Sequence, residues 1–144
     1  MNEHDYPVLI VTWSKNRDEI EPIRNQVFII EQNVPVELEW DGLDAEAIHV
    51  IAYNRSGMPA GTARLLCTGQ VGRMAVLPEE RNRGIGSAML RTLIQHAKTN
   101  SIGPLFLHAQ THAIKFYENH GFKQSGGIFY EAGIPHCKMI HVFD

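Results

Sequence analysis

The chain has 144 residues, with 13 Lys and Arg against 16 Asp and Glu, and a formal net charge of -3. This length is typical of one domain, which we expect to span residues 1–144, and the slightly acidic balance argues against a nucleic-acid partner. No apolar run approaches the roughly 18 residues of a membrane span. The polar first five residues lack the order of a signal peptide, and two cysteines distant in sequence fit a reducing compartment, so we expect a cytoplasmic protein.

The N-terminal part of the chain predicts a strand and then a helix. Residues 8–13 are β-branched and continuous, which is typical of a strand. Proline is best tolerated in the first turn of a helix, so we expect the helix to begin near Pro22 and to end at 33–35. Its apolar stripe has helical spacing and consists of Ile20, Ile23, Val27 and Ile30.

An acidic segment and three strands follow in the predicted order. Residues 36–47 are expected to form a loop or a short second helix, with the acidic side chains on a solvated surface. Strands are expected at 49–53 and 60–67, joined by a turn with Asn and Gly, and a third strand is expected at 71–77.

The C-terminal half predicts two more helices among three more strands. A helix from Gly84 precedes a buried strand at 105–109, and a second helix is expected at 112–120. The last strands are expected to begin at Phe122 and Lys138. The element order β-α-(α)-β-β-β-α-β-α-β-β predicts the α/β class, as one mixed sheet with helices on its faces.

The most informative segment joins the third predicted strand to the next helix. It holds two arginines and two glycines, and glycine lets backbone N–H groups approach a ligand. The first turn of a helix also leaves N–H groups unpaired at the positive end of its dipole. The segment therefore predicts a pyrophosphate site. Its residues are Arg81, Asn82, Arg83, Gly84, Ile85, Gly86 and Ser87.

Two motifs resemble those of the GCN5-related N-acetyltransferase (GNAT) family. The R-x-x-G-x-G pattern of 81–86 is similar to the family's acyl-CoA signature. The segment 113–122 is similar to its A-x-x-F-Y-x-x-x-G-F motif. The first third of the chain and the segment 131–136 resemble the ElaA-like branch of the family.

The resemblance implies an acetyl-CoA-dependent N-acetyltransferase that acts on a primary amine. It places the cofactor between the fourth and fifth strands, with the pantetheine arm along Met74, Ala75 and Val76. The family often has Asn where Gln110 stands, and that side chain contacts the arm. Tyr117 is implied to lie beside the sulfur, where its phenol can protonate the departing thiolate.

The general base is the open question of the sequence. Many family members carry a Glu on the strand before the glycine loop, but here Arg73 holds that position and cannot accept a proton. Replacement bases are Glu31, Asp44, His49, His108 and His136. Among them, hydrogen-bonded core roles are the simpler interpretation for His49 and His108, and we retain Glu31 and His136 as the catalytic candidates beside Tyr117.

Several alternatives concern partners. A domain of the same fold could bind acyl-CoA as a sensor or scaffold without catalysis, and an enzyme could use another acyl donor. We expect the acceptor to be a small-molecule or peptide amine, with no metal, and leave a homodimer open.

The charge of the sequence is unevenly distributed. Residues 1–60 carry 4 basic against 11 acidic side chains, and 61–144 carry 9 against 5. Because the acidic part would help to wall the acceptor site, this division favours a cationic acceptor.

Overall fold

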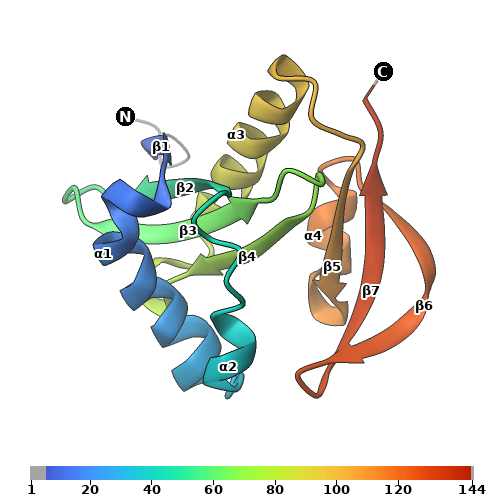
Figure 1. The fold of residues 1–144 in the computed structure, drawn as a ribbon, viewed down its shortest axis with the longest axis horizontal. Helices are drawn as coiled ribbons and strands as arrows, with labels where there is room; N and C mark the ends of the chain where they lie inside the picture. Colours follow the sequence, from blue (N-terminus) through green and yellow to red (C-terminus); the bar gives the residue numbers. More distant parts are fainter. Residues whose placement is uncertain (1–5, 144) are drawn as a thin grey trace.

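The computed structural model describes residues 6–143, so the polar first five residues lie outside the described residues. The elements follow the predicted order (Figure 1). The strands are β1 (Val8–Val11), β2 (Ile48–Tyr53), β3 (Pro59–Leu65), β4 (Val71–Val76), β5 (Leu105–Gln110), β6 (Lys123–Glu131) and β7 (Ile134–His141). The helices are α1 (Trp13–Arg24), a π-helix (Asn25–Glu31), α2 (Val36–Glu39), α3 (Ile85–Thr99) and α4 (Ile114–Glu118), with short 3-10 turns at Pro78–Glu80 and Thr111–Ala113.

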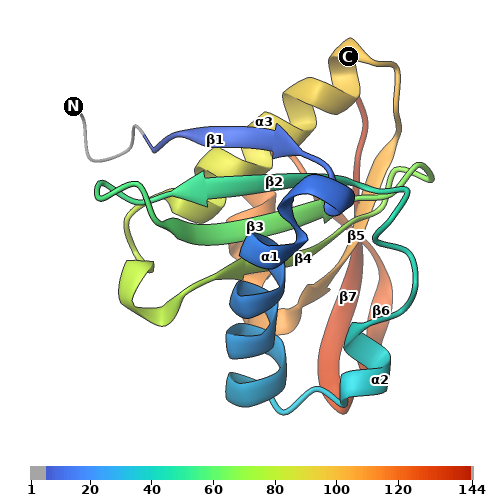
Figure 2. The same ribbon diagram turned by 60° about the vertical axis from the view of Figure 1, so that its left-hand side comes forward.

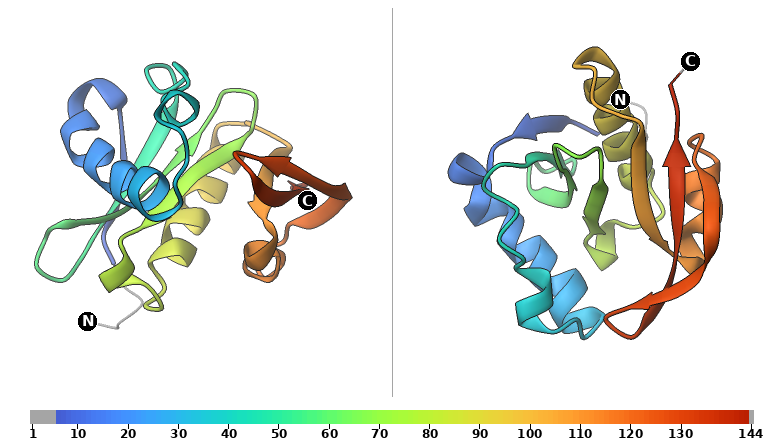
Figure 3. Two further views of the ribbon diagram at one scale, coloured as in Figure 1. Left: turned by 90° about the horizontal axis from the view of Figure 1, so that it is seen from below. Right: turned by 45° about the vertical axis from the view of Figure 1, so that its right-hand side comes forward.

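The strands form two antiparallel sheets rather than the one mixed sheet predicted. The first has the order β1-β2-β3-β4 and the second the order β5-β7-β6. Within residues 6–143 a single parallel bridge, between Gln70 and Phe106, joins them. Beyond that bridge β4 and β5 separate (Figure 3). The α/β class is confirmed, and the division of the sheet leaves one edge of β4 without a strand partner.

Helices on both faces explain why the central strands are buried throughout. Helix α1 covers one face of the four-stranded sheet and α3 covers the other (Figure 2). Strands β2 and β3 accordingly carry runs of buried residues, as expected for strands between two helical layers. The predicted apolar face of α3 is confirmed. Its residues Ile85, Met89, Leu90, Leu93 and Ala97 are all 1 % exposed or less.

The first helix begins earlier than predicted. It starts at Trp13 and contains Pro22 in its interior, and a π-helix follows it directly. In a π-helix each turn holds more residues than in an α-helix, so apolar residues with α-helical spacing no longer lie on one face. Val27 is buried at 3 % exposure, whereas Ile30, the last residue of the predicted stripe, is 59 % exposed.

A bulge interrupts β4 beside its free edge. Thr62 pairs with Ala75 and Arg64 pairs with Gly72, so Arg73 and Met74 together face one residue of β3. Arg73 has a positive φ of 50°. Such a bulge bends the strand and redirects backbone groups near a site.

The last two strands are longer than predicted and form a hairpin. Residues 131–136, which precede the last strand predicted from Lys138, end β6, turn at Ala132 and Gly133, and begin β7. His136 therefore lies in a strand, opposite Gln110 of β5 and Phe129 of β6. The hairpin turn and α2 lie at the same end of the molecule (Figures 1 and 2).

Candidate functional site

The loop before α3 has the local geometry of an anion site. Gly84 precedes the helix with a left-handed φ of 88°, and no side chain among the described residues caps that helix end. The amides of the first turn are therefore left for an external acceptor. A Cβ at Gly86 would lie 3.4 Å from Cζ of Phe116, so the glycine also allows α4 to pack closely. Ser87 meets His120, with 3.0 Å between Oγ and Nε2.

Arg81 is held by the protein itself. Its Nη1 and Nη2 each donate to a carboxylate oxygen of Glu31 at 2.6 Å, and its Nε donates to the carbonyl of Val76 at 2.9 Å. The hydrogen bonds from Arg81 lower the pKa of Glu31 below its usual range. A carboxylate with a lowered pKa is a weaker base, so this geometry gives Glu31 a structural role in fixing the loop to the π-helix. Arg83 contacts Glu80 at 3.1 Å and stays largely exposed.

Tyr117 lies against the bulged part of β4. Its hydroxyl is 3.9 Å from Sδ of Met74. Its ring packs edge-on against Phe116 and Phe122, with centroids 5.0 and 6.0 Å away. Burial raises the pKa of Tyr117 to about 12. The phenol therefore stays protonated at neutral pH and can donate a hydrogen bond to a group that enters beside Met74.

The end of β5 contacts the segment after α1. Gln110 donates from Nε2 to Oε1 of Gln32 at 2.9 Å, and its own Oε1 meets Nε2 of His112 at 2.8 Å. These bonds hold the Gln110 amide in place at the wall opposite β4. Gln32 follows the π-helix directly, and no pattern in the sequence connects it with Gln110.

A carboxylate connects two histidines on the second sheet. His108 of β5 has Nδ1 2.6 Å from Oε1 of Glu131, which ends β6. His136 of β7 has Nε2 4.0 Å from Oε2 of the same Glu131, and its Nδ1 donates to the carbonyl of Ile134 at 2.7 Å. Phe129 packs edge-on against His108 and is stacked with His136. Both histidines were candidate bases from the sequence, whereas Glu131 was not, because the hairpin that brings Glu131 to the two histidines was not predicted.

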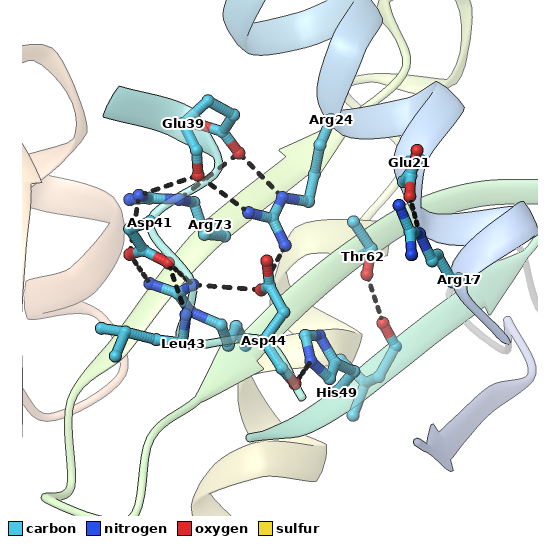
Figure 4. Close-up of polar contacts among 12 residues, drawn as sticks. Arg17, Glu21, Arg24, Glu39, Asp41, Leu43, Asp44, His49, Thr62 and Arg73 are labelled. Carbon is cyan, nitrogen blue, oxygen red and sulfur yellow. Dashed lines mark hydrogen bonds and ion pairs between the residues drawn. The ribbon is translucent and has the colours of Figure 1, made fainter. Parts of the chain in front are cut away.

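A buried ion network lies beside the bulge and contains Asp44, one of the candidate bases (Figure 4). Arg24 donates from Nε to Glu39 at 2.7 Å and from Nη1 to Asp44 at 2.6 Å. Arg64 contacts Asp44 at 3.1 Å and Asp41 at 2.9 Å. Glu39 and Asp44 are 2 % and 5 % exposed, so the prediction of a solvated acidic surface is wrong for them.

The same network holds Arg73 and adjoins His49. Arg73 contacts Glu39 at 3.3 Å and Asp41 at 3.1 Å, which places its charge among carboxylates. His49 is 1 % exposed and its Nε2 lies 3.0 Å from the backbone carbonyl of Asp44. Burial lowers the pKa of His49. The hydrogen-bonded core role expected for His49 is confirmed.

Among residues 6–143, no second functional site is indicated by a groove, a metal-binding cluster or a membrane-spanning helix. A groove of about 800 Å³ between β1 and α3 contains Tyr6, Arg91 and His96, but none of the predicted site residues. Residues 6–143 contain no group of three or more His, Cys, Asp or Glu side chains arranged to hold a metal. Nor does that part of the chain contain a helix long and apolar enough to cross a membrane.

Comparison with known proteins identifies relatives of this arrangement. An acetyltransferase (GNAT) domain model matches residues 16–143. The chain is 34 % identical over 134 residues to "Uncharacterized N-acetyltransferase YjcF" of Bacillus subtilis, covering 88 % of this chain and 95 % of that protein. It is 30 % identical over 128 residues to "Protein ElaA" of Escherichia coli, covering 81 % of each.

Solved structures agree with these matches. An acyl-CoA N-acyltransferase from Pseudomonas aeruginosa superposes with a TM-score of 0.82 and 27 % identity, over 96 % of this chain and all of that one. The crystal structure of Escherichia coli ElaA superposes with a TM-score of 0.85 and 23 % identity, over 94 % and 99 % of the two chains. The predicted resemblance to the GNAT family and to ElaA is thereby confirmed.

Proposed function

The chain belongs to the GNAT family of acetyltransferases and is an acyl-CoA-dependent N-acetyltransferase, and on that premise we propose that it transfers an acetyl group from acetyl-CoA to a primary amine. The single observation that carries the proposal is the position of the Tyr117 hydroxyl, 3.9 Å from Met74 Sδ on the bulged strand β4. Because the resemblance implies that the pantetheine arm runs along Met74, this contact supports a role for the phenol beside the thioester sulfur. The acceptor is a small-molecule or peptide amine.

Residues of β4 and of the loop before α3 suit the acyl-CoA. Strand β4 is the edge of its sheet, and its bulge at Arg73 and Met74 leaves backbone groups that can pair with the pantetheine arm or face the thioester oxygen. The amides from Asn82 to Ser87 would hold the pyrophosphate, with Gly84 providing the left-handed turn. Because the Arg81 side chain is occupied by Glu31 and its backbone amide donates to the carbonyl of Pro78 at 3.4 Å, Arg81 is proposed to fix the loop rather than to contact the pyrophosphate.

Tyr117 would stabilise the departing thiolate. An alkyl thiol has a pKa of about 8.5, whereas burial raises the pKa of Tyr117 to about 12. Complete proton transfer from this phenol to a thiolate would therefore be uphill. A hydrogen bond from the phenol to the sulfur, growing stronger as the C–S bond breaks, is the contribution that this pKa supports.

Of the two base candidates retained beside Tyr117, geometry supports His136 more than Glu31. Glu31 is tied to Arg81 by two short hydrogen bonds. His136 is a neighbour of Gln110 in the second sheet, and its Nδ1 donates to a carbonyl, so Nε2 carries the lone pair. Nε2 lies 4.0 Å from Oε2 of Glu131. His136 is accordingly proposed to line the acceptor side.

The proposal is tested by free-thiol release from acetyl-CoA with spermidine, 2-phenylethylamine and an alanine-initiated tripeptide. We expect turnover with at least one amine and a fall of about 10²-fold in kcat for Tyr117→Phe, with acetyl-CoA affinity retained. The Tyr130→Phe variant is the matched control, because Tyr130 is 71 % exposed on β6. Acetyl-CoA binding without turnover on a broad amine panel would favour the sensor or scaffold alternative.

A further inference from the structure

We propose that His108, oriented by Glu131, is the base that removes the proton from the acceptor amine. The inference rests on the proposed function and deepens it. It starts from the short contact between His108 Nδ1 and Glu131 Oε1, at 2.6 Å. An ionised carboxylate can only accept a hydrogen bond, so Nδ1 carries the proton and Nε2 carries the lone pair. A carboxylate that fixes an imidazole in this tautomer prepares it to accept a proton at Nε2.

His108 lies on the partly exposed face of β5. Side chains alternate along a strand, so His108 and Gln110 share this face. Gln32 contacts Gln110 on the same face, while Leu107 and Ala109 point into the core. The His108 side chain is 29 % exposed, and within residues 6–143 nothing hydrogen-bonds its Nε2. This nitrogen is therefore available to a reactant bound on this face of β5.

The other four candidate bases are bound by protein groups or are buried. Glu31 is bound by Arg81, and Asp44 is bound by two arginines. His49 is buried against a backbone carbonyl. The His136 side chain is 10 % exposed and its Nε2 faces Glu131 rather than open space. His108 alone among the five combines an accessible nitrogen with a carboxylate on the opposite one.

The reaction balances with one base and one hydrogen-bond donor. The amine nitrogen attacks the thioester carbon and forms the C–N bond, and His108 Nε2 accepts the proton that this nitrogen loses. The C–S bond then breaks, and the CoA thiolate leaves with a hydrogen bond from Tyr117. The imidazolium of His108, stabilised by Glu131, returns its proton to solvent.

The kinetic test uses whichever panel amine is turned over. The His108→Gln variant is expected to lose at least about 10²-fold in kcat at neutral pH, with KM for acetyl-CoA unchanged within about twofold. His96→Gln, on α3 and near the groove beside β1, is the matched control and is expected to match the wild type. Wild-type turnover by His108→Gln would overturn the proposal.

The tautomer of His108, measured by NMR, separates orientation from mere structural support. Glu131→Ala removes the acceptor of the Nδ1 proton, so this variant is expected to lose kcat and also the preference of His108 for the Nδ1–H tautomer. A loss of rate with the Nδ1–H tautomer retained would contradict the orienting role.

A measurement without any acceptor completes the test. Long-range proton–nitrogen NMR of the free protein is expected to show His108 in the Nδ1–H tautomer at pH 8. An Nε2–H tautomer would overturn the proposal, because that nitrogen could not then accept a proton. This measurement tests the role of His108 even if no panel amine is acetylated. The absence of acetylation would count against the proposed function alone.

Discussion

At the scale of single residues, the most consequential arrangement is the buried ion network beside β4. It joins Arg24, Arg64 and Arg73 to three carboxylates, so its formal charges cancel. Arg24 is completely buried, and its guanidinium also lies 4.7 Å from the ring centroid of Trp40. Burying charges is costly unless each is paired, so the network ties α1 and α2 to the sheet only while it is complete.

The first prediction concerns the loss of one partner from that network. Arg24→Leu leaves Glu39 and Asp44 buried without their shared cation, and we expect a loss of about 3–5 kcal/mol in the free energy of unfolding. Urea unfolding at neutral pH measures it. Arg17→Leu is the matched control, because Arg17 is 61 % exposed and pairs with Glu21 on the surface of the same helix. The control should lose less than about 1 kcal/mol. Equal losses in the two variants would contradict the structural role of the network.

The second prediction concerns acid stability. Burial alone would raise the pKa of Asp41, but hydrogen bonds from Arg64 and from the amide of Leu43, with the charges of Arg64 and Arg73, lower it below its ordinary value to about 2. A carboxyl with a lowered folded pKa stabilises the fold above its unfolded pKa and loses that contribution as pH falls through the folded value. The unfolding free energy of the wild type should therefore fall between about pH 4 and pH 2.

The comparison variant for this pH dependence is Asp41→Asn, which has no charge to lose. Its free energy of unfolding should depend less steeply on pH in the same window, as measured by urea titrations at several pH values. Identical slopes for the wild type and Asp41→Asn would refute the assigned ion pairs of Asp41.

At the scale of elements, the sequence predicted the regular parts well and the irregular parts poorly. The apolar face of α3 repeats with α-helical spacing, and its glycine-rich start has a recognisable chemistry, so both could be identified. The π-helix after Arg24 changes the helical phase, and the bulge at Arg73 changes the strand phase; neither follows from local periodicity. Glu131 reaches His108 only through the β6–β7 hairpin together with the long-range pairing of β7 with β5.

The third prediction concerns the start of α3. Gly84 has a φ of 88°, where a Cβ costs roughly 1–2 kcal/mol. Gly84→Ala should therefore distort the loop and weaken acetyl-CoA binding by about tenfold, since 1.4 kcal/mol corresponds to a factor of ten. Calorimetric titration with acetyl-CoA measures the change.

Gly127→Ala is the matched control for this loop. Gly127 lies in β6, and a Cβ there would meet nothing within 4 Å. Acetyl-CoA affinity should be unchanged in this variant. An unchanged affinity in Gly84→Ala as well would show that the loop conformation does not govern cofactor binding.

At the scale of the whole molecule, part of the uneven charge of the sequence is compensated inside the protein. Arginines of the basic part pair with acids of the acidic part: Arg64 with Asp41 and Asp44, and Arg81 with Glu31. Arg73 adds a further link, to Glu39. Three of the five carboxylates in the acidic segment 36–47, those of Glu39, Asp41 and Asp44, are thus paired with arginines, which weakens the main reason for expecting a cationic acceptor. Sequence counts could not reveal this, because the pairs join residues 20 to 50 positions apart.

The fourth prediction follows from this charge pairing. Only unpaired charges attract a ligand at long range, and salt screens that attraction. If the acceptor side carries little net charge, the KM of a polyamine such as spermidine should therefore change less than about threefold between 50 and 300 mM NaCl. Steady-state kinetics at fixed acetyl-CoA measure it. A steep rise in the KM of spermidine with salt, without one for 2-phenylethylamine, would restore the preference for a cationic acceptor.

Acyl-CoA is expected to bind between β4 and β5, with its sulfur beside Tyr117. A crystal structure of the CoA complex tests it most directly. We predict the pantetheine arm along the free edge of β4, the pyrophosphate at the amides before α3, and the sulfur within hydrogen-bonding reach of the Tyr117 hydroxyl. CoA bound in the groove between β1 and α3, or a sulfur distant from Tyr117, would contradict the account.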